Sequence, residues 1–93
     1  MEVTSIRISA LQALTVKHFA RESEDILIWT VFENAPHYPG EFIARPFSVL
    51  RNVTYRCHLS APKLEALREM LPAGMERLDR VSTDAPAVVE IWV

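Results

Sequence analysis

The chain has 93 residues, enough for one domain with a modest core and too few for two. Its 49% hydrophobic and 24% charged residues are typical of a folded globular protein and exclude an intrinsically disordered one. The net charge of −2 disfavours the broad electrostatic attraction that drives non-specific nucleic-acid binding.

Several classes of site and location are excluded by simple counts. The longest apolar run is 26–29, far shorter than the roughly 20 residues of a membrane-spanning helix. The first residues lack the basic start and apolar block of a secretory signal, so we expect none. One cysteine, Cys57, forms no internal disulfide, and two glycines make no phosphate-binding loop. The three histidines lack a local metal-ligand spacing. We therefore expect a cytoplasmic protein with no cofactor, no metal and no membrane partner.

The first 25 residues have the weakest pattern. Residues 3–8 favour a short strand, and Ser9 can cap a helix over 10–22. The apolar residues of that helix spread around its circumference instead of forming one stripe. We expect residues 1–25 to be an extension of the domain or a segment that covers its sheet.

The next stretch predicts two strands joined by a broad turn. Only Thr30 is not apolar between positions 26 and 32, which predicts a largely buried strand over 26–33. Pro36 and Pro39 end the ladder, so that His37 and Tyr38 lie at the tip of the turn. A second strand is predicted over 42–48. Pro46 has no N–H for the ladder, so we expect an edge or a bulge at the end of this strand.

The following segment combines a half-buried strand with a helix. Apolar and polar residues alternate over 53–59, which places Cys57 and His58 on opposite sides and disfavours a nucleophile–base pair. Ser60 can cap a helix over 61–71, whose apolar stripe contains Leu64 and Leu67. Pro72 and Gly74 then stop that helix.

The C-terminal part predicts a short extended piece over 75–81, with Leu78 pointing inward, and a final strand over 87–93. Glu90 is the only charged residue of this strand, so we expect its carboxylate to be paired. The candidate partners are Arg45, Arg77 and Arg80.

These elements predict a single α+β domain over 1–93. Its antiparallel sheet of about four strands (26–33, 42–48, 53–59 and 87–93) carries the helix 61–71 on one face. The alternative is a βαββαβ sandwich that also uses 3–8 as a strand and 10–22 as a first helix.

Three segments, 29–45, 67–80 and 84–92, resemble a group of small bacterial proteins with no assigned function. That group has a tryptophan before a Pro-x-x-Tyr/Phe-Pro turn, a Leu-Pro-x-Gly turn and a final Asp-x-Pro-x-x-Val-Glu-x-Trp pattern. The resemblance implies the same order of elements from 29 to 93 and implies no activity. The matching residues are Pro36, Tyr38, Pro39, Arg45, Pro72, Gly74, Arg77, Arg80, Asp84, Pro86, Glu90 and Trp92.

Three functions remain open. The first is a protein-interaction module or homo-oligomer without catalytic activity, because one helix leaves much apolar strand surface uncovered. Its candidate binding residues are His37, Tyr38, Arg45, Arg77, Arg80 and Glu90. The second is an anion or nucleic-acid site on a basic patch of Arg45, Arg51, Arg56 and Lys63. A small enzyme is the third and least favoured, and no catalytic residue is predicted.

Overall fold

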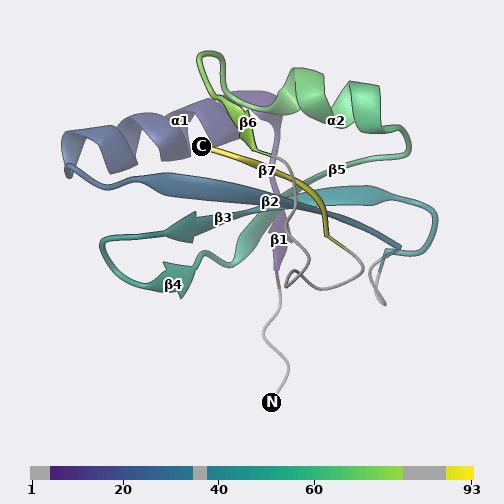
Figure 1. The fold of residues 1–93 in the computed structure, drawn as a ribbon, viewed down its shortest axis with the longest axis horizontal. Helices are drawn as coiled ribbons and strands as arrows, with labels where there is room; N and C mark the ends of the chain where they lie inside the picture. Colours follow the sequence, from purple (N-terminus) through teal and green to yellow (C-terminus); the bar gives the residue numbers. More distant parts are fainter. Residues whose placement is uncertain (1–4, 35–37, 79–87) are drawn as a thin grey trace.

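The computed structural model describes residues 5–34, 38–78 and 88–93. Within these residues it has two helices and one open, mixed sheet, so the α+β class is as predicted. Figure 1 shows the arrangement. The elements in chain order are β1 (Ile6–Arg7), α1 (Ala10–Glu22), β2 (Leu27–Glu33), β3 (Phe42–Ser48), β4 (Val53–Thr54), β5 (Cys57–Ala61), α2 (Leu64–Met70), β6 (Arg77–Leu78) and β7 (Val88–Trp92).

The sheet is larger than the predicted four strands. Its order is β1-β5-β3-β2-β7-β6, with β4 paired to β3 beside this path. The central strands β5, β3, β2 and β7 correspond to the four predicted ones, but β1 pairs parallel with β5 and makes the sheet mixed. The additional strands have two residues each: β1 lies within the strand 3–8 of the alternative sandwich, β4 within the predicted strand 53–59, and β6 within the predicted extended piece 75–81.

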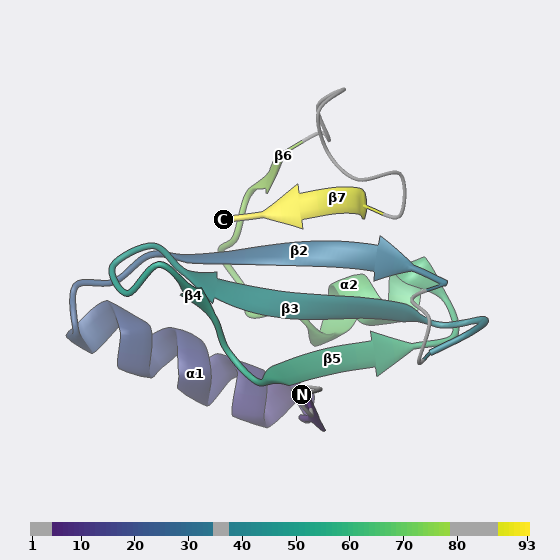
Figure 2. The same cartoon turned by 90° about the horizontal axis from the view of Figure 1, so that it is seen from below.

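Both helices lie on the same face of the sheet (Figures 1 and 2). Their buried residues Ala13, Ala20 and Leu67 belong to one core cluster with the inward residues of β2, β3 and β5. A hydrogen bond of 2.7 Å from Lys17 Nζ to the Ala73 carbonyl joins α1 to the turn after α2. The described part of the chain places no helix on the opposite face, which we call the uncovered face.

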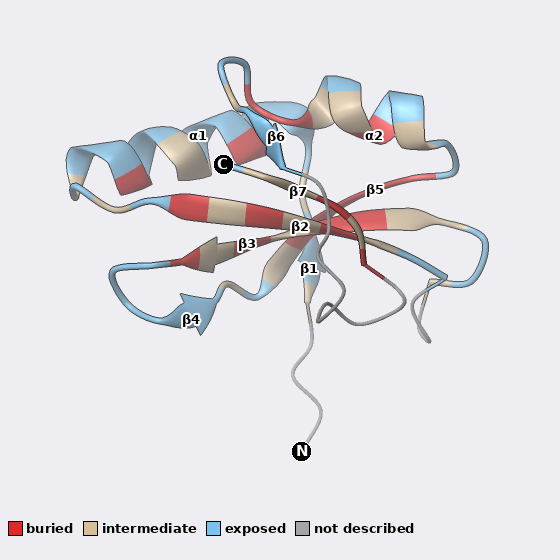
Figure 3. Ribbon diagram, in the orientation of Figure 1, coloured by how far each residue is buried: buried red, intermediate tan, exposed pale blue. Residues whose placement is uncertain are grey.

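The first helix begins and ends where its sequence predicts, but its orientation is unexpected. Ser9 forms a capping box with Gln12, which fixes the start of α1. The helix buries the small residues Ala13 and Ala20 and leaves Leu11 and Phe19 largely exposed. Much of α1 is accordingly pale blue in Figure 3. Residues 5–25 therefore supply the strand and the helix that the alternative sandwich included, and α1 covers the same face as α2.

The second helix is shorter than predicted. It begins at Leu64 after Lys63, and no side chain caps it. The expected cap, Ser60, instead belongs to β5, where it pairs with Ile43 and is buried. Strand pairing with β3 keeps Ser60 and Ala61 extended, and α2 therefore begins three residues later than predicted. The hydrogen bonds of the sheet outweigh the local capping signal of Ser60.

The prediction for Pro46 is confirmed in part: this proline lies buried within a central strand, paired with Trp29, and not at an edge, but the strand that faces it on its other side is bulged. The Pro46 carbonyl accepts a hydrogen bond of 2.9 Å from the Tyr55 amide. The predicted strand 53–59 breaks beside it into β4 and β5. Proline is tolerated because its missing N–H faces this break, where Arg45 Nη2 donates to the Tyr55 carbonyl in its place.

Candidate functional site

The predicted binding residues fall on opposite faces of the sheet. Glu90 and Arg77 lie on the face that carries the helices, whereas Arg45 lies on the uncovered face. Tyr38 packs against His58 of β5, with ring centroids 4.7 Å apart. His37 and Arg80 lie outside the described residues. The six predicted residues therefore do not form one site.

The Glu90 carboxylate is the centre of a buried ion pair beneath α2. It is 4% exposed and accepts hydrogen bonds from Arg68 Nε at 3.0 Å and Arg68 Nη2 at 2.8 Å. Trp92 Nε1 donates a third, of 2.9 Å, and Arg77 Nη1 lies 3.8 Å away. The hydrogen bonds from Arg68 hold the pKa of Glu90 below its usual value.

Arg68 was not among the expected partners of Glu90. Its place next to Leu67 in the helix pattern suggested a solvent-facing side chain, yet its long stem reaches β7 along the edge of α2. Arg45 is excluded as a partner because it points to the other face. This cluster joins a helix to a strand and leaves the carboxylate no room for a ligand, so we interpret it as structural.

A row of cross-strand neighbours runs over the uncovered face. The pairing of β2 places Thr30 beside Arg45 and beside Ile91, and the parallel pair places Arg7 beside His58. Continuing the register of β5 puts His58 next to Arg45. The row from edge to edge is Leu78, Ile91, Thr30, Arg45, His58 and Arg7. One end of the row is apolar and the other is basic.

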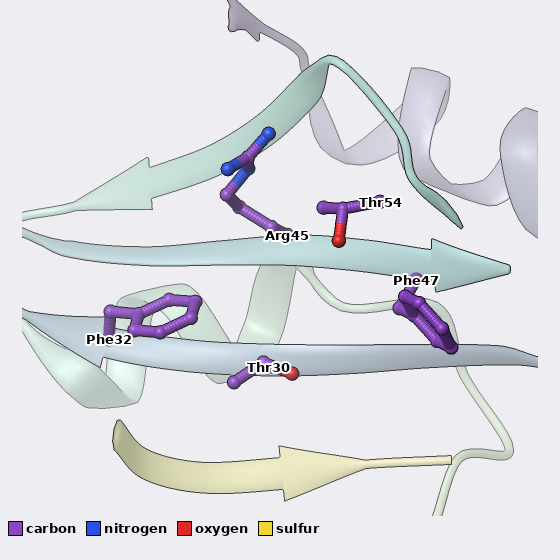
Figure 4. Close-up of a pocket in the computed structure, with 5 residues that line it drawn as sticks. All are labelled: Thr30, Phe32, Arg45, Phe47 and Thr54. Carbon is purple, nitrogen blue, oxygen red and sulfur yellow. The ribbon is translucent and has the colours of Figure 1, made fainter. Parts of the chain in front are cut away.

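A hollow of about 80 Å³ opens at the centre of this row. Phe32 and Phe47 lie on either side of Thr30 and Arg45, and Thr54 completes the lining (Figure 4). The sequence analysis named Arg45 but missed the other four residues. Strand alternation could have grouped them, because Thr30 and Phe32 share one side of β2 while Arg45 and Phe47 share one side of β3.

Arg45 is placed by a shift of register in the facing strand. Phe47 pairs with Thr54 and Ala44 pairs with Leu59, so three steps along β3 face five steps along the partner. The two extra residues form a bulge opposite Arg45. Arg45 Nη2 donates a hydrogen bond of 3.3 Å to the Tyr55 carbonyl. Pro46 cannot donate to this carbonyl because proline has no backbone N–H.

The guanidinium of Arg45 is only partly satisfied. Its Nε is buried and has no hydrogen-bond partner among the described residues. None of the described carboxylates forms an ion pair with it. A buried donor without an acceptor is unfavourable.

His58 lies at the basic end of the row and contacts Ser5. Ser5 Oγ lies 2.7 Å from His58 Nδ1, which ties β1 to β5. The imidazole is 1% exposed, and its Nε2 has no partner among the described residues. Although a serine and a histidine are in contact, the described chain holds no acid on Nε2 to orient the ring, and burial keeps a substrate away.

Stability should depend on the protonation of His58. Burial lowers the pKa of this imidazole, the charges of Arg45 and Arg7 lower it further, and Glu41 opposes them. The unfolded chain therefore takes up a proton near the ordinary value of 6.5 while the folded protein does not. The free energy of unfolding should fall as the pH drops from about 7.5 to 5.5. Chemical denaturation at each pH measures it.

The variant His58→Gln is the control, because it keeps a hydrogen-bonding group beside Ser5 but cannot titrate. Its stability should change less over the same range, and the other histidines are present in both proteins. Equal slopes for the two proteins would mean that His58 takes up a proton as readily in the folded protein as in the unfolded chain.

The predicted basic patch is not assembled. Arg51 follows the C-terminal end of β3, whereas Lys63 follows Ala61, which pairs with Phe42 at the other end. The seven residues of β3 separate these ends by about 20 Å. Of the four predicted residues only Arg45 lines the hollow.

Other classes of site find little support. Within the described residues, no group of three or more His, Cys, Asp or Glu side chains could hold a metal ion. Burial raises the pKa of the Cys57 thiol, which disfavours the reactive thiolate. No helix in the described ranges is both long and apolar enough to cross a membrane.

Comparisons with known proteins do not add a function. No protein-family model matches the chain, and neither the curated proteins nor the solved structures include a match. The resemblance to the group of small bacterial proteins therefore remains an expectation.

Proposed function

We propose that this protein is a non-catalytic binding module that recognises an acidic segment of another protein through its uncovered sheet face. The observation that supports this most is Arg45, which lines the hollow together with two phenylalanines and whose buried Nε has no hydrogen-bond partner among the described residues. A partly apolar surface with a positive centre is complementary to a segment that carries apolar residues around a carboxylate.

A second copy of this chain fits the same face less well. When two copies meet face to face with Arg45 at the centre of the contact, the two guanidinium groups come close together, and like charges oppose such a contact. The sheet edges offer little alternative, because the outer strands β1 and β6 have only two residues each. Self-association therefore ranks second, and light scattering over a concentration series tests it.

Nucleic acid also fits less well than a protein segment. The basic residues of the predicted patch lie at different ends of the sheet, so they do not follow a phosphate backbone. The hollow of about 80 Å³ is smaller than the about 300 Å³ or more of typical small-molecule pockets. It suits the tip of a side chain.

Selection from a library of short random peptides tests the proposed function. We expect enrichment of segments with Asp or Glu next to aliphatic residues, bound with micromolar affinity. The variant Phe47→Glu should weaken binding by at least about tenfold, because it places a negative charge beside Arg45. Fluorescence anisotropy with a labelled selected peptide measures the affinity.

Leu14→Glu is the matched control, since Leu14 is 49% exposed on the outer side of α1. Binding should be unchanged in this variant. If Leu14→Glu abolishes binding and Phe47→Glu does not, the binding surface is α1. If no peptide is enriched, the proposal fails.

A further inference from the structure

The hollow around Arg45 has an unused binding edge. Nη2 donates one hydrogen bond, to the Tyr55 carbonyl at 3.3 Å, and Nε has no partner among the described residues. A guanidinium carries five N–H donors in a planar fork. The Nε side of the fork can therefore accept a ligand while the bond to Tyr55 is kept.

The same chain shows which group fits this edge. In the buried pair beneath α2, Arg68 uses Nε and Nη2 to hold the two oxygens of Glu90 at 3.0 and 2.8 Å. Side-on pairing of this kind satisfies two donors with one planar anion. Arg45 presents the corresponding atoms without an anion from the described residues.

The volume and charge of the hollow restrict the class of ligand that it can bind. About 80 Å³ is the space of roughly two to three waters, enough for a carboxylate and the methylene that carries it. Only one of the five lining residues, Arg45, is charged. One guanidinium balances one negative charge, whereas a doubly charged phosphate would leave charge uncompensated against two phenylalanine rings.

We infer that the hollow is a receptor for a single carboxylate, the side chain of an aspartate or glutamate in the bound protein segment. This inference rests on the proposed function and specifies its central contact. Nε and Nη2 of Arg45 grip the two carboxylate oxygens. The hydroxyls of Thr30 and Thr54 line the same hollow, and Phe32 and Phe47 enclose the methylene groups.

A titration of the ¹⁵N-labelled protein with sodium acetate tests the inference directly. We expect the side-chain Nε–H signal of Arg45 to move and saturate at millimolar acetate, together with the amides of Thr30 and Thr54. Sodium chloride at equal ionic strength should not reproduce this change. An Arg45 signal that acetate leaves unmoved would overturn the inference without the need for any variant.

Substitutions then test the fork. Arg45→Met keeps the aliphatic stem and should remove acetate binding, whereas Arg45→Lys keeps the charge but loses the fork and should weaken it about tenfold. Arg51→Met changes an exposed arginine outside the hollow and should have no effect. Each variant is first compared with the parent by its amide spectrum, because Arg45 also serves the Tyr55 carbonyl. A folded Arg45→Met protein that binds acetate as the parent does would contradict the inference.

The inference and the proposed function can fail separately. If selected peptides bind this face but acetate does not compete and Arg45→Met keeps full affinity, the face binds protein without a carboxylate receptor. If acetate binds at Arg45 but no peptide is retained, the carboxylate receptor is confirmed and the protein-binding function is wrong. If inorganic phosphate binds more tightly than acetate, the ligand of the hollow is a phosphate group and not a carboxylate.

Discussion

Replacing Arg68 with alanine should lower the free energy of unfolding by about 3 kcal/mol. Glu90 is 4% exposed, and Arg68 supplies two of its three described hydrogen bonds, so the variant leaves a buried carboxylate with little compensation. Breaking a fully buried pair costs about 3–5 kcal/mol. We expect the lower end of this energy range because the Arg68 side chain is 34% exposed. Chemical denaturation measures the change, and Tm should fall by about 10 °C or more.

Arg77→Ala is the matched control for this prediction. Its guanidinium is 3.8 Å from Glu90 and 49% exposed, so its removal should cost at most about 1 kcal/mol. Equal losses for the two variants would show that Glu90 does not depend on the bonds from Arg68.

The pair of Glu90 and Arg68 should also make the free energy of unfolding depend on pH in the acidic range. Because the pKa of Glu90 is lowered, its contribution is complete above the ordinary value of 4.5 and is lost as the pH falls through the folded-state pKa. Glu90→Gln should flatten this part of the pH profile.

Replacing Trp29 with alanine should destabilise the protein even more, by about 3–5 kcal/mol. The side chain is completely buried at the centre of β2, between Pro46 of β3 and Trp92 of β7. Its loss opens a cavity in the only core cluster that the described residues form with the helices. Urea denaturation should show a lower midpoint with an unchanged slope, which reports a loss of stability without a change of fold.

Trp29→Phe separates packing from polarity at this position. Trp29 Nε1 is buried without a hydrogen-bond partner among the described residues, so phenylalanine removes an unsatisfied donor as well as some volume. We expect this variant to cost less than about 2 kcal/mol. A loss as large as that of Trp29→Ala would show that the indole N–H has a partner in solution.

Local signals in the sequence determined much of the fold. The apolar run after Ile26 predicted β2, and the residues from Phe42 predicted β3, because both strands are long enough to show their pattern. Ser9 predicted the start of α1 because a capping box is made by residues three apart. The α+β class followed from these elements, and so did the opposite directions of Cys57 and His58.

Contacts between distant segments decided the rest. Only the tertiary structure shows that α1 joins α2 on one face, because a helix that packs through Ala13 and Ala20 has no apolar stripe to reveal its inner side. Only pairing with β3 held Ser60 in a strand. Arg68 became the partner of Glu90 because the packing of α2 brought it to β7. The bulge opposite Arg45 arises where two strand registers meet, and this long-range geometry turns an ordinary strand arginine into a candidate receptor for a carboxylate.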